Sequence, residues 1–258
     1  MNLRNEKREL EACRAVFQHL RDQRVLNAKA DETYQWCHAH DARILYPGHE
    51  DYPFNSEPFD HRPPFLACWG EPSWRRRPSI AVVGSREPSS EALSWMETHL
   101  VEFLRATSAV VVSGGARGID QRAHRLAIRS GCPTVVFLPS GLACPYPGEW
   151  QNWKHDVLAG GGALLSHYPP FQEIRRIHFE ERNRLIAALG KILLVVEARR
   201  RSGSSMTARL AADLGRTVCV LPGHPSDPRA GGTIDLLFDG AEPIRDATDL
   251  VMQFSKGI

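Results

Sequence analysis

Six short apolar runs, separated by helical stretches, most strongly constrain what this chain can fold into. The runs are rich in β-branched residues and span 80–83, 110–112, 134–138, 163–165, 192–196 and 217–221. Amphipathic stretches lie between most of them, at 89–106, 119–130, 180–189 and 204–214. Strands that are apolar throughout and alternate with helices are typical of a parallel sheet covered on both faces. We therefore predict an α/β fold with a Rossmann-like, doubly wound, mainly parallel sheet.

The first 70 residues have a different character. Residues 5–27 are charged and lack Gly and Pro, which predicts a helix, and a second short helix is expected over 32–40. The stretch 41–78 contains seven prolines and predicts only short strands near 44–46 and 65–69. The tail after residue 232 indicates one helix and a short strand. We predict a small N-terminal helical and irregular module over 1–70 and a Rossmann-like domain over 71–258.

Composition excludes several classes of protein. The 258 residues are 42% hydrophobic and 24% charged, as in a globular protein. No apolar run approaches the roughly 20 residues of a membrane span, and the start, MNLRNEKREL, lacks a signal-peptide core. We expect a cytoplasmic protein with free thiols and no membrane association. We also expect no metal site, because the nearest candidates form no defined zinc ligand set: Cys37, His38, His40 and His49.

The net charge of +2 conceals a segregation along the chain. Residues 103–220 carry 16 basic and 8 acidic side chains, whereas the remaining residues carry 16 and 22. Arginine accounts for 27 of the 32 basic residues. The planar guanidinium matches phosphate geometry and so favours anion recognition. Codon bias would give the same ratio, and composition alone does not separate the two explanations.

Four turns rich in Gly and Ser follow predicted strands, at 84–86, 113–118, 139–141 and 202–205. In open α/β sheets ligands bind beyond the carboxyl ends of the strands. Small residues before a helix leave backbone N–H groups free to bind anions, aided by the helix dipole. Tight turns alone would also use Gly and Ser. Four such turns, two of them containing arginine, favour phosphate binding.

The nucleotide-enzyme motifs are absent from these turns. The first turn is not G-x-G-x-x-G, the following strand does not end in a carboxylate, and no G-x-x-x-x-G-K-[ST] occurs. Phe179 instead precedes two arginines, Arg182 and Arg184, with Asn183 between them. Bases can stack on a ring while guanidinium groups hold the backbone of a single strand. A solvated helix face is the alternative interpretation.

Candidate catalytic groups are few. Asp120 and His124 are four residues apart on a predicted helix and could act as a general-base pair, but no nucleophile accompanies them. Trp150 and Trp153 are three apart and are better explained by packing than by base stacking. No close carboxylate pair adjoins a Gly-rich turn. We predict no catalytic residues, no cofactor and no enzymatic activity.

The order of the motifs resembles the DNA-processing protein A (DprA/Smf) family over roughly residues 41–250. The motifs are GSR at 84–86, SGGARGIDQRAH at 113–124, PSGLACPYP at 139–147, LLSHYPP at 164–170, RNRLIAALG at 182–190, VVEARRRSGSSMTA at 195–208 and LPG at 221–223. This resemblance implies a Rossmann-like domain that binds single-stranded DNA and forms homodimers. It also implies that the strand passes to a RecA-type recombinase during natural transformation, without turnover of substrate.

The resemblance also implies roles for particular residues. Arg86 would hold phosphate, next to Gly84 and Ser85 of the same turn. A backbone cradle would be formed by Ser113, Gly114, Gly115 and Gly118, with Arg117 adding charge. The strand path would be lined by Phe179, Arg182, Asn183 and Arg184, with Phe179 contacting a base. The rim would be completed by Ser202, Gly203, Ser204 and Thr207.

Some features depart from that family. Glu180 stands where Pro is usual, His167 stands where Glu is usual, and the chain ends without the winged-helix module of many members.

The alternative is a nucleotide-binding or nucleotide-processing protein of the lysine-decarboxylase-like (SLOG-type) superfamily. The P-G-G-x-G-T-x-x-E signature of that superfamily ends in a catalytic glutamate. The nearest segments here, 222–224 and 231–233, supply no such glutamate. A regulatory relative that senses a nucleotide is the third possibility.

Overall fold

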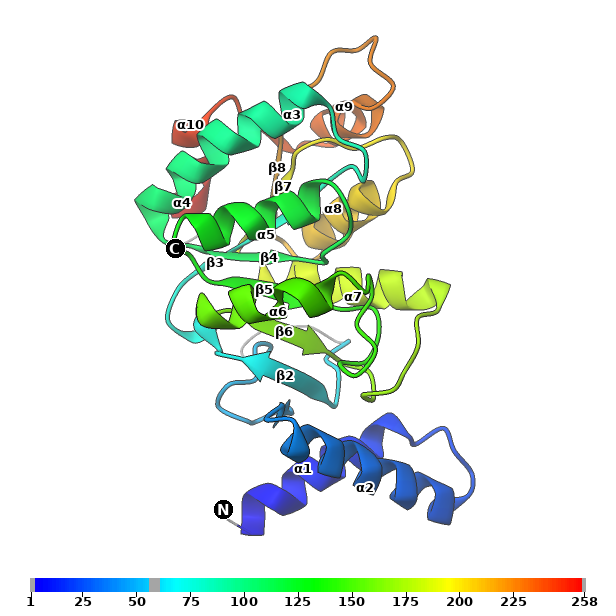
Figure 1. Ribbon diagram of the computed structural model, residues 1–258. Helices are drawn as coiled ribbons and strands as arrows, with labels where there is room; N and C mark the ends of the chain where they lie inside the picture. Colours follow the sequence, from blue (N-terminus) through cyan, green and yellow to red (C-terminus); the bar gives the residue numbers. More distant parts are fainter. Residues whose placement is uncertain (1–2, 56–60, 257–258) are drawn as a thin grey trace.

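The computed structural model describes residues 3–55 and 61–256, which form one nine-stranded sheet with helices on both faces (Figure 1). The strand order is β1-β2-β6-β5-β4-β3-β7-β8-β9. All six predicted strands are present and parallel to one another. They are β3 (Ser79–Val83), β4 (Val110–Ser113), β5 (Thr134–Phe137), β6 (Ala163–Ser166), β7 (Ile192–Val195) and β8 (Thr217–Val220). The predicted α/β class and Rossmann-like sheet are confirmed.

The proline-rich segment adds two strands to this sheet. β1 (Arg43–Leu45) pairs antiparallel with β2 (Leu66–Gly70), and β2 pairs antiparallel with β6. At the opposite edge, the two-residue β9 (Glu242–Pro243) pairs with β8. The sheet therefore extends across the boundary that the sequence placed at residue 70. Within the described residues, only the two N-terminal helices lie beyond the sheet edge that β1 forms.

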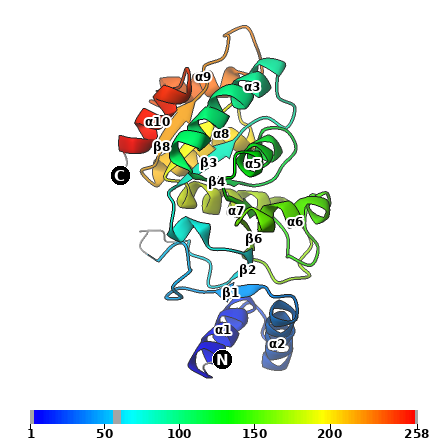
Figure 2. The ribbon, with the colours of Figure 1, turned by 60° about the vertical axis from the view of Figure 1, so that its left-hand side comes forward.

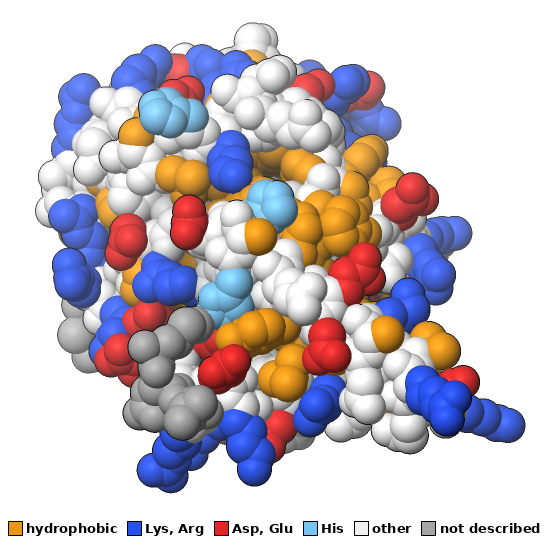
Figure 3. Space-filling view, turned by 60° about the horizontal axis from the view of Figure 1, so that its bottom comes forward, with side chains coloured by type: hydrophobic (Ala, Val, Ile, Leu, Met, Phe, Trp, Pro, Cys, Tyr) orange, Lys and Arg blue, Asp and Glu red, His pale blue; other side chains and the backbone are white. Residues whose placement is uncertain are grey.

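The prediction of one helix over 5–27 is wrong. The chain forms α1 (Leu3–Val16) and α2 (Gln23–Ala39), which lie side by side at one end of the molecule (Figure 2). The Asp22 carboxylate accepts hydrogen bonds from the backbone N–H groups of Arg24 (2.8 Å) and Val25 (3.4 Å). A side chain that caps a helix in this way starts a new helix at that point. Seen from this end, basic and acidic side chains are interspersed around hydrophobic ones (Figure 3).

Helices cover the two faces of the sheet unequally (Figures 1 and 2). One face carries α3 (Ser90–Trp95), the π-helical turn η2 (Met96–Leu100), α4 (Val101–Thr107), α5 (Ile119–Arg129), α6 (Trp150–Ala159) and α10 (Ala247–Lys256). The other carries α7 (Arg176–Leu189), α8 (Gly203–Asp213) and α9 (Gly231–Phe238). A 3-10 turn, η1 (Ser73–Arg75), precedes β3. The carboxyl-terminal tail contains two helices, α9 and α10, whereas the sequence predicted one. None of the helices described is both long and apolar enough to cross a membrane.

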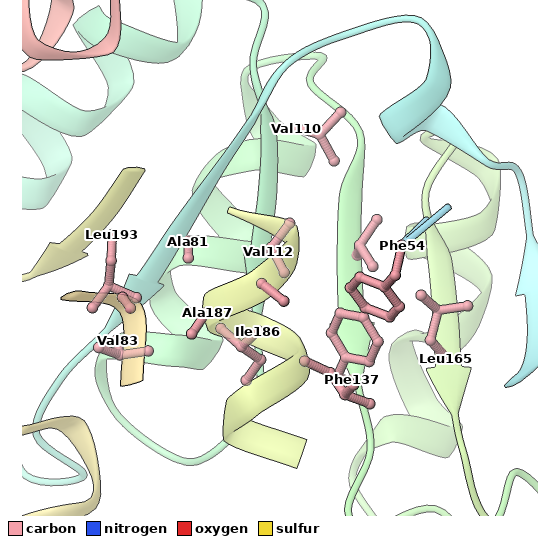
Figure 4. Close-up of a cluster of buried hydrophobic side chains, with 14 of the residues drawn as sticks. Phe54, Ala81, Val83, Val110, Val112, Phe137, Leu165, Ile186, Ala187 and Leu193 are labelled. Atoms are coloured by element: carbon pink, nitrogen blue, oxygen red, sulfur yellow. The ribbon is translucent and has the colours of Figure 1, made fainter. Parts of the chain in front are cut away.

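The core beneath α7 fixes the position of that helix. Ile186 and Ala187 of α7 lie over side chains from the central strands, among them Val112 and Phe137 (Figure 4). The Phe54 ring lies beside the Phe137 ring, with centroids 6.5 Å apart. Because α7 is buried along this length, its amino-terminal half is held rigidly above the carboxyl ends of the strands.

Replacing Phe137 with alanine should lower the free energy of unfolding by about 3–5 kcal/mol, because the ring is fully buried and its removal leaves a cavity. Phe238, which is 88% exposed, is the matched control: Phe238→Ala should change stability by less than about 0.5 kcal/mol. Urea unfolding measures both. Equal effects of the two substitutions would contradict the assignment of Phe137 to the core.

Candidate functional site

The candidate site lies where the order of the sheet reverses direction. β3 pairs with β4 on one side and β7 on the other, so the chain winds outward from β3 in one direction and from β7 in the other. Such a switch point leaves a crevice at the carboxyl ends of the two strands. The turn at Gly84 and Ser85 follows β3, and the turn at 202–205 follows β7 and begins α8. Two of the predicted turns therefore meet here.

Three turns are joined by short contacts. The Ile119 backbone N–H donates to the Ser85 carbonyl oxygen (3.1 Å), and the Ser204 hydroxyl donates to the Gly84 carbonyl oxygen (2.8 Å). Gly118, at φ +83°, approaches so closely that a Cβ would lie 2.3 Å from the Ser85 oxygen. Only glycine fits there. The amino ends of α5 and α8 thus converge on the first turn and present N–H groups and positive dipole ends to one crevice.

Two adjoining pockets, of about 430 and 770 Å³, open over these turns. We call them together the arginine groove. Both are lined by Arg86, Glu87, Ala116, Phe179 and Arg182. The first pocket also contains seven other predicted residues, namely Gly84, Ser85, Asn183, Ser202, Gly203, Ser204 and Thr207. The second contains the predicted residues Gly114 and Arg117.

The Arg182 guanidinium forms part of the floor of the groove. This residue is only 4% exposed, yet its Nε and Nη1 have no hydrogen-bond partner among the described residues. Burial lowers the pKa of Arg182 to about 10, and the negative charge of Asp120 opposes that shift. The side chain is therefore still protonated at neutral pH. A buried cation with unsatisfied donors is costly to keep, and the negative charge of an anion in the groove would offset that cost.

Gly114 makes room for this guanidinium. A Cβ built on Gly114 would lie 0.9 Å from the Arg182 Nη1, so any side chain at this position would displace the arginine. The turn was expected to act as a backbone cradle for phosphate. Its first glycine lines the second pocket and also admits Arg182 beside the backbone.

Asp120 and His124 lie on α5 below the groove and have separate partners. The Asp120 carboxylate accepts from the Ala116 backbone N–H (3.3 Å); burial raises its pKa, and the charge of Arg182 opposes the rise. The His124 Nδ1 is 2.7 Å from the Thr134 hydroxyl. Burial, and then Arg182, lower the pKa of His124 to about 3. The described residues contain no group of three or more His, Cys, Asp or Glu arranged to hold a metal ion.

Aromatic rings form one wall of the groove. The Phe179 ring is half-buried, with the Arg86 Cζ 5.9 Å and the Arg182 Cζ 6.0 Å from its centroid. Tyr146, 42% exposed, contacts Phe179 edge-on with centroids 6.0 Å apart. Arg86 itself is exposed. The wall thus combines ring faces with two cations.

Several predicted hydroxyl groups already have local partners. The buried Ser113 hydroxyl donates to the Val82 carbonyl oxygen (2.6 Å), and the Thr207 hydroxyl donates to the Gly203 carbonyl oxygen (2.8 Å). The Ser202 oxygen accepts from the Ser205 backbone N–H (3.2 Å) and caps α8. Gly115 adjoins the Trp150 ring and lines neither pocket. These residues shape the turns, and the arginines remain the main free donors.

Arg184 is not brought together with the other predicted residues. Residues 182 and 184 point about 200° apart around a helix, and Arg184 lines a separate pocket of about 760 Å³. Its Nη2 lies 3.5 Å from the Glu180 carboxylate, which lines that same pocket. His167 also lines it, with Nε2 3.7 Å from Glu181. The negative charge of Glu180 therefore faces away from the arginine groove.

Sequence reasoning missed some of the lining residues. Ala116 and Met206 line the first pocket, and Tyr146 and Glu149 line the second. Arg199, which the sequence already placed at the rim, also lines the first pocket. Tyr146 belongs to the PSGLACPYP motif. The motif was recognised in the sequence, but its order in the chain did not show that Tyr146 lines the site. Its backbone N–H donates to the Ser140 hydroxyl (3.0 Å), so the third Gly/Ser turn positions this ring.

A doubly wound sheet with an arginine-lined groove at its switch point defines a Rossmann-like anion-binding protein. The family model of DNA recombination-mediator protein A matches residues 43–255, and the chain belongs to this family of recombination mediators.

Relatives agree in sequence and in structure. The chain is 32% identical over 203 residues to DNA processing protein DprA of Streptococcus pneumoniae, covering 79% of this chain and 71% of that protein. It is 36% identical over 171 residues to DprA of Bacillus subtilis, covering 66% of this chain but only 57% of that protein. The solved S. pneumoniae structure superposes with a TM-score of 0.75 at 30% identity, covering 90% and 82% of the two chains. A structure of DNA processing protein A from Helicobacter pylori, which addresses its single-stranded DNA binding mode, gives 0.71 at 27% identity, covering 83% and 96%.

Substituting Gly114 with alanine should destabilise the protein by about 1–3 kcal/mol, because the new methyl group and the Arg182 guanidinium cannot occupy the same space. Gly148→Ala is the control, since a Cβ there meets nothing within 4 Å. Urea unfolding of both variants would decide. A Gly114→Ala protein as stable as the Gly148→Ala protein would show that Arg182 does not lie over Gly114.

The stability of the protein should fall as the pH drops from about 6.5 towards about 3, in part because of His124. Below about pH 6.5 the unfolded chain binds a proton at this residue, whereas in the folded protein burial keeps the ring neutral until about pH 3. His124→Gln removes the titration and should flatten the decrease. Urea unfolding at a series of pH values measures the slope, and identical slopes in the two proteins would contradict the buried neutral histidine.

Proposed function

We propose that this chain binds single-stranded DNA in the arginine groove, by phosphate capture and without turnover. The observation that carries the proposal is the unsatisfied Arg182 guanidinium on the floor of the groove. A phosphate oxygen accepts hydrogen bonds from guanidinium N–H groups in the geometry that the fork provides. Arg86 at the rim supplies a second cation, and the amino ends of α5 and α8 supply backbone donors.

A single strand suits the groove better than a duplex. Phe179 and Tyr146 offer ring surfaces next to the cations, and only unpaired bases can stack on such rings. Stacking is tolerant of sequence, which accords with a groove that presents guanidinium and backbone donors rather than a set of base-reading side chains. The H. pylori relative, studied for its single-stranded DNA binding mode, supports the same ligand.

Arg117 contributes less than its exposure suggests. Its Nη2 lies 3.2 Å from the Glu149 carboxylate, which also accepts from the Gln121 amide (3.1 Å). Both contacts, with Gln121 first, lower the pKa of Glu149 and keep it charged. An arginine that is already paired with a carboxylate gains little from a phosphate. Arg86, for which the described residues offer no carboxylate within ion-pair distance, gains more.

A binding role without catalysis is supported by the state of the buried titratable groups. His124 bonds to Thr134 and is kept neutral, and Asp120 is held next to Arg182. The Thr134 hydroxyl next to His124 is buried and donates to the Val111 carbonyl oxygen (2.9 Å), so it is not placed to attack a substrate. We infer that these side chains set the electrostatics of the groove rather than transfer protons.

We infer a role in recombination from membership of the recombination-mediator family. In this role the strand passes to a RecA-type recombinase during natural transformation, and the protein acts as a homodimer in the cytoplasm. Because the chain spans 71% of the S. pneumoniae protein and 57% of the B. subtilis protein, this wider role is inferred from the family as a whole.

A free nucleotide is the alternative ligand. The first pocket, of about 430 Å³, lies at a switch point where mononucleotides bind in other open α/β sheets. A competition with free nucleotides separates the two ligands, because a nucleotide-binding protein would bind the nucleotide more tightly than a single strand.

Arg86→Ala should weaken binding to an oligo-dT strand by about 1.5–3 kcal/mol, the range for a lost charge-assisted hydrogen bond. The dependence of log K on log salt should become shallower by about 0.7, because one phosphate contact is removed. Fluorescence anisotropy across a salt series measures both quantities, with a duplex and free nucleotides as competitors.

Two arginine variants serve as controls. Arg117→Ala should lose less than Arg86→Ala, since Arg117 is already paired with Glu149. Arg105 is an exposed residue of α4 outside the groove, so Arg105→Ala should bind as the parent protein does. Equal binding by the parent and Arg86→Ala would contradict the proposed phosphate contact of Arg86. Tight binding of nucleotides without binding of oligo-dT would favour a free nucleotide as the ligand.

A further inference from the structure

A pocket of about 390 Å³ lies on the far side of the loop that borders the arginine groove. It is lined by aromatic rings from four segments, Trp36 of α2, Trp69 of β2, Trp150 of α6 and Phe171 of the loop before α7, together with Lys154 of α6. We call it the aromatic pocket. None of these five residues lines the arginine groove.

The rings leave accessible aromatic surface. The Trp36 and Phe171 rings meet at 73° with centroids 6.1 Å apart, and the Trp36 and Trp69 centroids are 5.4 Å apart. The His40 ring stacks on one face of Trp36, with centroids 4.3 Å apart. Phe171 is 57% exposed, unusually high for a phenylalanine held by its neighbours. A flat, unpaired ring system could stack on these surfaces.

A cation lies among the rings. The Lys154 Nζ is 3.1 Å from the centroid of the Trp69 ring, and burial lowers the pKa of Lys154. Among the residues the structure describes, Lys154 makes no ion pair with a carboxylate. A cation without a carboxylate partner, next to ring faces, matches the two parts of a nucleotide unit, a phosphate and a base.

One short loop separates the aromatic pocket from the arginine groove. Leu142, Ala143 and Pro145 line the pocket, and the next residue, Tyr146, lines the groove. Backbone hydrogen bonds tie this loop to the Phe171 segment, from Gly141 N–H to the Gln172 oxygen (2.8 Å) and from the Ala143 N–H to the Pro170 oxygen (2.9 Å). Both flanks of the path are therefore held in place.

We propose that the aromatic pocket is a second contact for the same single strand, engaged only when the strand is long enough to leave the groove past Tyr146 and cross the loop. One base stacks on the Phe171 and Trp36 rings, and Lys154 faces the adjoining phosphate. This inference rests on the proposed binding of single strands in the groove. A protein side chain inserted in the pocket is the competing occupant, and the experiment below distinguishes it.

The test is a binding series with oligo-dT strands from about 4 to about 32 nucleotides, a range that spans known single-strand site sizes. Phe171→Ala removes an exposed ring from a loop, so the fold should be retained, and urea unfolding verifies this. The variant should bind the shortest strands as the parent does and the longest strands about 5-fold to 100-fold more weakly, the equivalent of one stacked base. Phe171→Trp keeps a ring and should restore binding of the long strands.

The possible outcomes separate the second contact from the proposed function. Equal binding of long strands by the parent and Phe171→Ala, with Arg86→Ala still impaired, overturns the second contact and leaves the proposed function intact. Equal weakening at all lengths also overturns it, because the pocket would then not be a distal contact. A change in oligomeric state of Phe171→Ala by light scattering would assign the pocket to a second copy of the chain. Absence of binding to any strand by the parent overturns the proposed function and this inference together.

Discussion

The buried guanidinium of Arg182 is the constraint on which the rest of the site depends. It occupies space that only a glycine at position 114 can leave, and its charge lies beside the Asp120 carboxylate. The same charge helps to keep His124 neutral, next to the Thr134 hydroxyl. The Arg182 cation thus determines which residues can stand in α5, in α7 and in the turn that follows β4. A protein that bound no anion here would offset the cost of this buried cation only in part, through the charge of Asp120.

The fold holds that cation in place through α7. One end of the helix packs on the central strands through Ile186 and Ala187, and the other end carries Phe179 and Arg182 above their carboxyl ends. A rigid support of this kind lowers the entropy that a ligand would otherwise have to remove on binding. The departures from the family pattern, Glu180 and His167, both line the separate pocket of about 760 Å³, where Glu180 lies near Arg184 and His167 near Glu181. They leave the groove unaltered.

The sequence predicts the central strands and turns well because their signals are local. A buried parallel strand is apolar throughout, and a turn at a switch point needs small residues, so 84–86 and 202–205 could be recognised directly. The pairing of β2 with β6 could not, since it joins segments almost a hundred residues apart and depends on the whole sheet. The division of the predicted helix over 5–27 into two was also missed, because the start of α2 depends on one capping side chain, that of Asp22. The contrast between Arg182 and Arg184 follows from helix geometry, but which of the two faces the groove is decided by the packing of α7. The aromatic pocket is formed by rings from four segments that are far apart in the sequence, so no local pattern could predict it.

The most direct measurement is the affinity of Arg182→Gln for oligo-dT over a salt series, with the folded fraction verified by urea unfolding. If the unsatisfied guanidinium is the anion site, binding should weaken at least about tenfold and the slope of log K against log salt should become shallower by about 0.7. A folded Arg182→Gln protein with the affinity and salt slope of the parent would contradict phosphate capture by Arg182 at the floor of the arginine groove.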